Sequence, residues 1–198
     1  MKKIVSLLLA VMMLSTLAFA GLAETEPEGT EYTFEAEYIY LEGLEGLGVS
    51  GSPTGTGLAS ESGKASNEFF LGNLGVNSPI TFKITSSAAA TATLKICVGT
   101  NVLGTQTWDP TSFIVTVNDV ALEYEPFTTE PGTDPTDQQN FKVKNLGEIE
   151  LIEGENVIVF VAGENTFRSN MPSAPSIDYI RLITTAELTM EEYPENIE

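Results

Sequence analysis

Short segments in which apolar and polar residues alternate with a period of two constrain the fold of this chain most. Residues 80–85, 91–98 and 113–118 show the alternation most clearly. Successive side chains of a β-strand point to opposite faces, so this period indicates strands with one buried and one solvated face. Almost no segment has the 3.6-residue period of an amphipathic helix. The sequence therefore predicts an all-β fold.

Further strands are expected at residues 69–71, 141–143, 148–152, 156–161 and 177–183. Short strands in this number, most of them with one polar face, favour a two-sheet antiparallel β-sandwich of the jelly-roll type. Asn118-Asp119 and Glu153-Gly154-Glu155 are turn sequences between strands, and each predicts a tight hairpin.

The two ends of the chain differ from this middle. Residues 1–20 combine Lys2 and Lys3 with a short apolar run and Ala18-Phe19-Ala20, which is the pattern of a secretory signal peptide. No other run is apolar for long enough to cross a bilayer, so we expect no membrane span and a secreted protein, extracellular or attached to a cell surface. The boundaries expected are 1–20 for the signal peptide, 21–31 for an acidic linker, 32–185 for the sandwich and 186–198 for an acidic tail.

Composition excludes several kinds of chemistry. The 198 residues include no histidine and a single cysteine, Cys97. This excludes Ser-His-Asp hydrolysis, histidine general-base chemistry and most zinc sites, and one thiol cannot form an internal disulfide. We therefore expect Cys97 to be structural. Acidic residues number 28 against 9 basic ones, so nucleic acid is not an expected partner.

Residues 32–41 are predicted to be extended, with two carboxylates, Glu35 and Glu37, on one face. Side chains two residues apart on a strand lie about 6–7 Å from each other, so the two charges repel unless water screens them or a cation bridges them. Two interpretations of this spacing stay open. One is the solvated outer face of an edge strand, and the other is a site for a hard cation.

Several motifs then follow one another in a recognisable order. They are Glu35-Ala-Glu37, Ser66-Asn-Glu-Phe-Phe-Leu-Gly72, Val115-Thr-Val-Asn118, Leu151-Ile-Glu-Gly-Glu-Asn-Val-Ile158 and Ile177-Asp-Tyr-Ile180. In this order, over residues 32–185, the chain resembles the carbohydrate-binding modules of families 6 and 35. The resemblance implies a β-sandwich that binds saccharides in loops at one end and holds a structural calcium near the chain termini.

The resemblance assigns Glu35, Glu37 and Asp178 to the calcium site. A sandwich whose first and last strands lie side by side would bring Asp178 to the two glutamates, and backbone carbonyls would complete the oxygen ligands that calcium needs. Calcium bound there would stabilise the folded state by tying the two chain ends together, without a part in any reaction.

Sugar recognition requires an exposed aromatic plane with polar side chains around it. The resemblance aligns Phe70 with an aromatic residue of the family's sugar site, whereas Asn67-Glu68 and Ser176 depart from the usual residues there. Trp108, in an expected loop at 99–111, is either a stacking platform or a plug at the end of the core. Further candidates for ligand binding are Arg168 and Asn170, as polar contacts, and Tyr124 and Phe127.

Three functions remain open. The favoured one is a non-catalytic module that binds a plant or cell-wall polysaccharide or oligosaccharide, alone or within a larger surface or glycan-degrading assembly. The second is an extracellular structural or adhesive sandwich without sugar binding, in which Trp108 is buried. The third is a glycan hydrolase or lyase, which requires a pair of carboxylates facing a shared cleft. No specific motif supports the third function.

Overall fold

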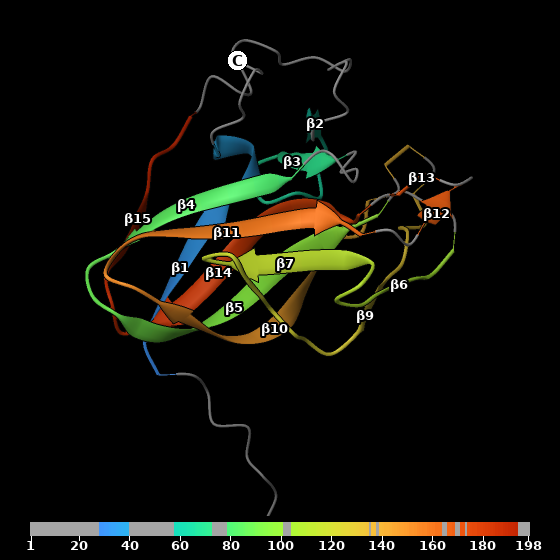
Figure 1. Cartoon of the computed structure of the whole chain (residues 1–198). Helices are drawn as coiled ribbons and strands as arrows, with labels where there is room; N and C mark the ends of the chain where they lie inside the picture. Colours follow the sequence, from blue (N-terminus) through green and yellow to red (C-terminus); the bar gives the residue numbers. More distant parts are fainter. Residues whose placement is uncertain are drawn as a thin grey trace, which may run out of the picture.

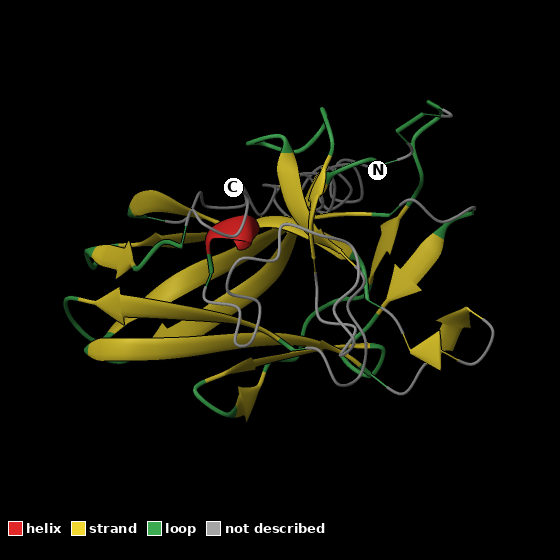
Figure 2. Ribbon diagram, turned by 90° about the horizontal axis from the view of Figure 1, so that it is seen from above, coloured by secondary structure: helices red, strands yellow, loops and turns green. Residues whose placement is uncertain are grey.

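The computed structural model describes residues 28–39, 58–72, 79–100, 104–134, 136–137, 139–163, 166–168, 171–172 and 174–193. They form an all-β, two-sheet antiparallel sandwich of the predicted jelly-roll type, with the strands in two layers (Figures 1 and 2). The expected signal peptide and most of the expected linker lie outside the described residues. Where the structure describes the chain, it contains no helix of the length and apolar character that crossing a membrane requires.

The first sheet has the strand order β10-β5-β14-β3-β2, and β1 also pairs with β14. Its strands are β1 (Thr30–Glu35), β2 (Leu58–Glu61), β3 (Phe69–Gly72), β5 (Ala90–Gly99), β10 (Lys142–Leu151) and β14 (Ser176–Thr184). The second sheet has the order β15-β4-β11-β7-β8. Its strands are β4 (Ile80–Ser86), β7 (Phe113–Val117), β8 (Val120–Ala121), β11 (Gly154–Ala162) and β15 (Leu188–Met190).

Two small two-stranded sheets lie at one end of the sandwich (Figure 1). One pairs β6 (Gln106–Trp108) with β9 (Phe127–Thr129), and the other pairs β12 (Thr166–Arg168) with β13 (Met171–Pro172). The predicted strands at 69–71, 80–85, 91–98, 113–118, 156–161 and 177–183 correspond to β3, β4, β5, β7, β11 and β14. The predicted segments at 141–143 and 148–152 belong to one strand, β10. A bulge between Asn145 and Gly147 interrupts that strand, and Gly147 adopts a φ of +103° there.

Aromatic and branched side chains from the two sheets meet in the core. The largest fully buried ones are Phe82, Phe113, Phe160, Ile39, Leu71, Ile80, Ile84, Leu94, Ile96, Leu146 and Ile158. The Phe160 ring stacks on Phe113 and meets Phe82 edge-on, with both centroid distances at 5.8 Å. Each such burial contributes about 1.5–3 kcal/mol, so a core of this size stabilises the domain without a disulfide. Cys97 is a free, buried thiol.

The first strand is shorter than predicted, and neighbouring strands explain why. On one side of β14, residues 179–184 pair with β1, whereas Ile177 pairs with Leu71 of β3. Because β3 occupies the next place along that edge, β1 ends at Glu35 and the chain turns into the 3-10 helix η2 (Ala36–Tyr38). The expected alternation therefore breaks, and Ala36 and Glu37 are both buried.

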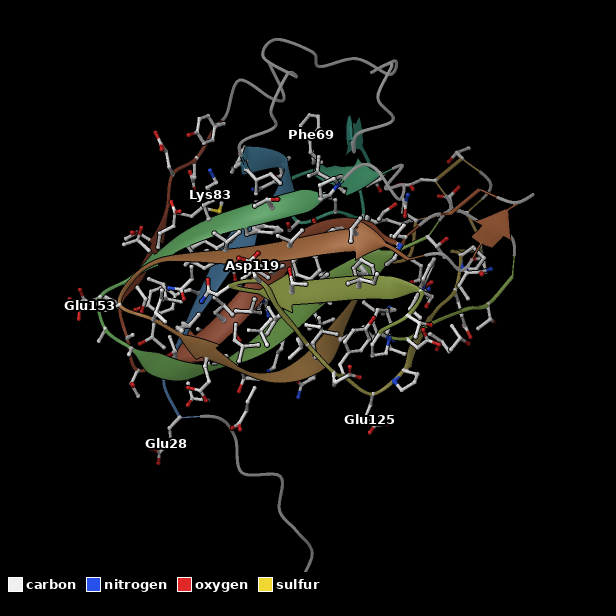
Figure 3. All side chains as sticks on the ribbon, viewed as in Figure 1. Glu28, Phe69, Lys83, Asp119, Glu125 and Glu153 are labelled. Atoms are coloured by element: carbon white, nitrogen blue, oxygen red, sulfur yellow. The ribbon has the colours of Figure 1, made fainter. Side chains whose placement is uncertain are left out.

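The two predicted turns have different roles. Asn118 and Asp119 adopt φ values of 50° and 65° and join β7 to β8 in the predicted two-residue hairpin. Glu153, labelled in Figure 3 at one end of the sandwich, lies between β10 and β11. Those strands belong to different sheets and do not pair with each other, so the prediction of a hairpin at 153–155 was wrong. The turn is a connection between the two layers.

The sandwich extends beyond both predicted boundaries. Thr30 and Glu31, assigned to the linker, pair with Thr184 and Ile183 of β14. Leu188–Met190, assigned to the acidic tail, form the edge strand β15 against β4. Ala186 and Leu188 are buried in the core. The prediction of an acidic tail relied on the glutamates of residues 186–193. These glutamates flank apolar side chains that are buried against the second sheet.

Candidate functional site

Three carboxylates meet where β1 and β3 adjoin along β14. Glu35 is the last residue of β1, Glu37 lies on η2, and Asp178 occupies an irregularity in the pairing of β14 with β5. The helix η2 contacts both β3 and β14. Glu37 is completely buried and Asp178 is 2% exposed. We call Glu35, Glu37 and Asp178 the carboxylate cluster, and the structure brings together the residues that the resemblance had assigned to calcium.

Ser66 joins two members of the carboxylate cluster. Its backbone N–H and its hydroxyl both lie 3.0 Å from Asp178 Oδ1, and its hydroxyl lies 2.5 Å from Glu35 Oε2. Ser66 belongs to the segment of residues 62–68 between β2 and β3, which folds back on itself through a 2.7 Å bond from the Ser62 N–H to the Glu68 carbonyl. Ser66 of this segment thus donates hydrogen bonds to Glu35 and Asp178, two carboxylates that β1 and β14 hold close together.

Burial shapes the electrostatics of this cluster. It raises the pKa of Glu37 to about 7, and the neighbouring charges of Glu35 and Asp178 add to the effect. Burial also raises the pKa of Glu35 and of Asp178, against the hydrogen bonds from Ser66, which lower both. The Cys97 thiol beside Asp178 has its pKa raised to about 12, chiefly by burial, so it stays a protonated structural group as predicted.

The donor set of the carboxylate cluster suits a hard cation, because carboxylate and hydroxyl oxygens are the ligands that calcium prefers. Within the described ranges, however, no group of three or more histidine, cysteine, aspartate or glutamate side chains is arranged to hold a metal ion. The calcium assignment to Glu35, Glu37 and Asp178 therefore stays a prediction. Its residues are adjacent and mutually repelling, and the Ser66 hydroxyl lies between two of them.

A second group of polar and aromatic residues gathers at one end of the first sheet, where β3 and β5 end and β10 and β14 begin. We call it the Gln139 cluster, and its members are Phe70, Gly99, Gln139, Phe141 and Ser176. The Phe70 and Phe141 rings lie 5.3 Å apart at 57°. The Gln139 side-chain N–H donates to Ser176 Oγ across 3.4 Å. The family resemblance assigned Phe70 and the position of Ser176 to the sugar site. In the structure both residues belong to this one cluster.

Glycine at position 99 permits this packing. A Cβ atom there would lie 2.9 Å from a Phe141 ring carbon and 3.0 Å from Gln139 Oε1. Both side chains therefore occupy the space beside Gly99 and lie next to each other. Gln139 is only 4% exposed, whereas Phe141 is half-buried.

Asp137 holds the chain just before Gln139 against the 62–68 segment. Its Oδ2 accepts a 2.6 Å hydrogen bond from the buried Ser62 hydroxyl, and its Oδ1 accepts one of 3.1 Å from the Gln139 backbone N–H. Lys64 Nζ donates to the Asp137 carbonyl oxygen. One short segment therefore contacts the carboxylate cluster through Ser66 and, through Ser62 and Lys64, contacts Asp137 beside the Gln139 cluster.

The aromatic residues predicted to stack on sugar are mostly buried. Trp108 is 4% exposed, its indole N–H donates to Thr129 Oγ1 at 2.9 Å, and its ring packs on Phe113. This burial agrees with the plug interpretation, and the Trp108 ring offers no open face for stacking. Phe70 is 6% exposed and Tyr124 8%, so neither offers an open ring face.

The remaining predicted ligand residues lie elsewhere or outside the described residues. Phe127 is half-buried, packs on Phe113 and Tyr124, and lies under the Lys144 ammonium. Arg168 ends β12, but its side chain lies outside the described residues, as does the whole of Asn170.

Sequence reasoning assigned no role in a site to Gln139, Phe141 or Ser66. Gln139 and Ser66 lie in segments without periodicity, and single polar residues of such segments carry no signal that separates them from their neighbours. Phe141 was noticed only as the start of an expected strand. The signal that identifies Phe141 is its position directly after a loop, at the same sheet end as Phe70, and only the strand order reveals that position.

No protein-family model matches the sequence, and sequence comparison with curated proteins finds no match. Among solved structures, a family 35 carbohydrate-binding module from an environmental isolate is 19% identical, with a TM-score of 0.52 over 82% of this chain and 99% of that one. A family 35 module from Clostridium thermocellum gives 13% identity and a TM-score of 0.53 over 77% and 97%. The module of Cellvibrio japonicus Abf62 gives 12% and 0.51 over 81% and 97%. The chain has the fold of family 35 carbohydrate-binding modules.

Proposed function

We propose that this protein is a secreted, non-catalytic carbohydrate-binding module that holds a plant or cell-wall polysaccharide. The observation that carries the proposal is the match of its fold to family 35 carbohydrate-binding modules, over 77–82% of this chain and 97–99% of those modules. Fold alone does not determine function, so the proposal also needs a site with suitable chemistry.

The Gln139 cluster supplies that chemistry. A sugar ring is bound by an aromatic face and by polar side chains around it. Phe141 is the half-buried aromatic ring of the cluster, and Phe70 supports it from inside the sheet. Gln139 and Ser176 supply an amide and a hydroxyl beside it. We place the polysaccharide at this end of the first sheet, with Phe141 in the stacking role that Trp108 does not fill.

We also propose that the carboxylate cluster binds a structural calcium ion. When bound, the doubly charged ion would offset most of the negative charge of Glu35, Glu37 and Asp178 and so reduce the repulsion among them. Because β1 and β14 are near the two chain ends, such an ion would add to the folded state alone and raise its stability. We further propose that the module works within a larger surface or glycan-degrading assembly.

The second candidate function is a structural or adhesive sandwich without sugar binding. The burial of Trp108 favours it, because that was the feature expected of a sandwich lacking a tryptophan platform. It differs from the first in its prediction for Phe141, which would then have only a packing role.

The test is retardation of the purified protein in native gels that contain plant or bacterial polysaccharides. We expect retardation by at least one neutral polysaccharide, and its loss in Phe141→Ala. The matched control is Phe69→Ala, since Phe69 is also half-buried, belongs to β3 and, as a strand neighbour of Phe70, faces the other side of the sheet. Absence of retardation by every glycan, with the protein folded, would leave the structural sandwich as the better account.

A further inference from the structure

We propose that Ser62, Ser66 and Asp137 are positioning residues of the saccharide site, and that the carboxylate cluster controls through them how tightly the Gln139 cluster binds its ligand. This inference rests on the proposed function and deepens it by naming what regulates the same site. Its support is one series of hydrogen bonds, which runs from Asp178 through the 62–68 segment to Gln139.

The 62–68 segment is a closed loop with its own internal hydrogen bonds. The Ser62 N–H donates to the Glu68 carbonyl at 2.7 Å, and the Ala65 N–H donates to the Ser62 carbonyl at 3.0 Å. Glu68 adopts a φ of 67°, which a residue with a Cβ atom keeps only where surrounding contacts impose it. A segment closed in this way has few internal degrees of freedom, so a displacement of Ser66 is transmitted to Ser62.

Ser66 attaches one part of the segment to the carboxylate cluster. Its N–H and its hydroxyl both lie 3.0 Å from Asp178 Oδ1, and its hydroxyl lies 2.5 Å from Glu35 Oε2. A hydroxyl has one proton, so it donates to only one of these two carboxylates at a time. A change in the charge or spacing of the two carboxylates therefore changes the bonds that hold Ser66. Among the described residues, Ser66 forms no hydrogen bond with a member of the Gln139 cluster.

Ser62 attaches the other part of the segment to the chain that precedes β10. Ser62 is 4% exposed, and its hydroxyl donates to Asp137 Oδ2 at 2.6 Å, although the two residues are 75 positions apart in the sequence. Asp137 Oδ1 accepts the Gln139 backbone N–H at 3.1 Å. Hydrogen bonds to a carboxylate are stronger than those between neutral groups. Asp137 therefore fixes the position of the Gln139 backbone relative to the 62–68 segment.

The position of Asp137 matters because the Gln139 cluster is tightly packed. The Gln139 side chain and the Phe141 ring share the space beside Gly99, where an added Cβ would lie 3.0 Å from Gln139 Oε1 and 2.9 Å from a ring carbon of Phe141. Groups that bind one ligand together must be held to within about 0.5 Å of their productive positions. A shift of Asp137 by this amount would move Gln139 away from the place where it and Phe141 contact the same sugar.

The test is a double-mutant cycle of Ser62→Ala and Ser66→Ala. Affinity is measured by retardation in native gels with graded amounts of galactan, mannan, xyloglucan or glucuronoxylan, well below the melting temperature of each variant. We expect each single variant to bind about threefold more weakly or worse, and the double variant to bind no more weakly than the weaker single one, because both act through one segment.

Two further variants show whether the loss is specific. The matched control is Ser86→Ala in the second sheet, because Ser86 is 2% exposed and its hydroxyl also donates a bond, to the Ala88 carbonyl at 2.7 Å. This variant should bind like the parent. Ser66→Thr keeps the hydroxyl at an exposed position and should also bind like the parent. If Ser62→Ala does not fold, Asp137→Ala, at a half-buried position, removes the same bond from its other side.

Calcium provides a second arm with the same proteins. We expect calcium to tighten polysaccharide binding by the parent, and the polysaccharide to tighten calcium binding by the same factor. In Ser62→Ala, calcium should still raise the melting temperature but leave the polysaccharide affinity unchanged. A parent protein whose melting temperature responds to calcium while its polysaccharide affinity does not overturns the inference. A melting temperature that does not respond contradicts the calcium proposal alone, and the serine variants then decide the inference.

The outcomes separate this inference from the proposed function. A Ser66→Ala variant that binds like the parent overturns the inference, and so does a double variant whose loss is the product of the two single losses. Either result leaves the proposed function standing, because the parent still binds. Failure of every glycan to retard the parent contradicts the proposed function itself, and the inference with it.

Discussion

Single aromatic residues decide what this sandwich can offer a ligand. Trp108 carries the largest aromatic ring of the chain, yet it lies against Phe113, with its indole N–H bound to Thr129. A buried tryptophan with a satisfied N–H contributes to the core rather than to a surface. Phe141, by contrast, keeps part of its ring exposed beside Gln139. The only tryptophan is thus structural here, and we assign the proposed stacking role to the half-buried Phe141.

The burial of Trp108 gives the first prediction. Because it is the only tryptophan, the fluorescence of the folded protein reports its surroundings alone. We expect a blue-shifted emission that acrylamide quenches weakly and that shifts to the red on unfolding. Trp108→Ala should cost about 3–5 kcal/mol of unfolding free energy, as large core truncations do. Red emission from the folded protein, or quenching of free-tryptophan strength, would contradict the buried position.

At the scale of elements, the end of each strand is set by what pairs beside it. The strand β1 stops at Glu35 because β3 takes the adjoining place on β14, and this leaves Glu37 on a turn next to Asp178. The turn between β7 and β8 is fixed differently. Asn118 Oδ1 accepts from the Val157 N–H and its amide donates to Asn156, so the hairpin is tied to β11 by side-chain bonds.

A pair of substitutions in this hairpin should have opposite effects. Asp119→Gly places glycine at a φ of 65°, where it is unstrained, and we expect neutral to slightly raised stability, by up to about 1 kcal/mol. Asn118→Gly also relieves a positive φ but removes the bonds to Asn156 and Val157, so we expect a loss of about 1–3 kcal/mol. Chemical denaturation of both variants measures the difference. Equal effects would show that the side-chain bonds of Asn118 contribute nothing.

The strand β15 also carries a prediction. Leu188 is 5% exposed and belongs to the core cluster, so Leu188→Ala should lower the unfolding free energy by about 2–4 kcal/mol. Glu191→Ala, three residues further and exposed, should change it by less than about 0.5 kcal/mol. If both variants were as stable as the parent, residues 186–190 would be a tail after all.

The whole molecule combines a strong negative charge with a buried group of acids at its chain ends. Tyr193 donates its backbone N–H to the Tyr38 carbonyl, so the last described residues return to η2 and the carboxylate cluster. Arg181, paired with Glu31 at 3.3 Å, is the nearby basic group that lowers the pKa values of Glu35 and Asp178. The negative charge of the carboxylate cluster that Arg181 does not offset is reduced further when a proton or a cation binds.

Stability in the presence of chelator should therefore depend on pH in an unusual direction. The pKa of Glu37 is about 7 in the folded protein and near its usual 4.5 when unfolded. A raised carboxyl pKa stabilises the fold fully below about pH 4.5, and this contribution is lost as the pH rises through about 7. We expect the unfolding free energy to fall by an amount on the order of 3 kcal/mol over this window.

Controls separate this effect from the general charge. Glu37→Gln should flatten the pH dependence, and Glu150→Gln, at an exposed position of β10, should not. Added calcium should raise the melting temperature most at high pH, where the carboxylates are ionised. Stability that rises with pH in chelator would contradict the assigned burial of Glu37.

The local sequence pattern determines some structural features of this protein, and long-range packing determines others. The period of two along residues 80–85, 91–98 and 113–118 was enough for the all-β class and for most strand positions, because the side-chain alternation of a strand is a local property. The positive-φ hairpin at Asn118 and Asp119 was equally local. Other features depend on which strands pair and which loops fold over their ends. They are the place where β1 ends, the burial of Trp108 and the adjacency of Gln139 to Phe70 and Ser176. These are contacts between residues far apart in the chain, and only the tertiary structure decides them.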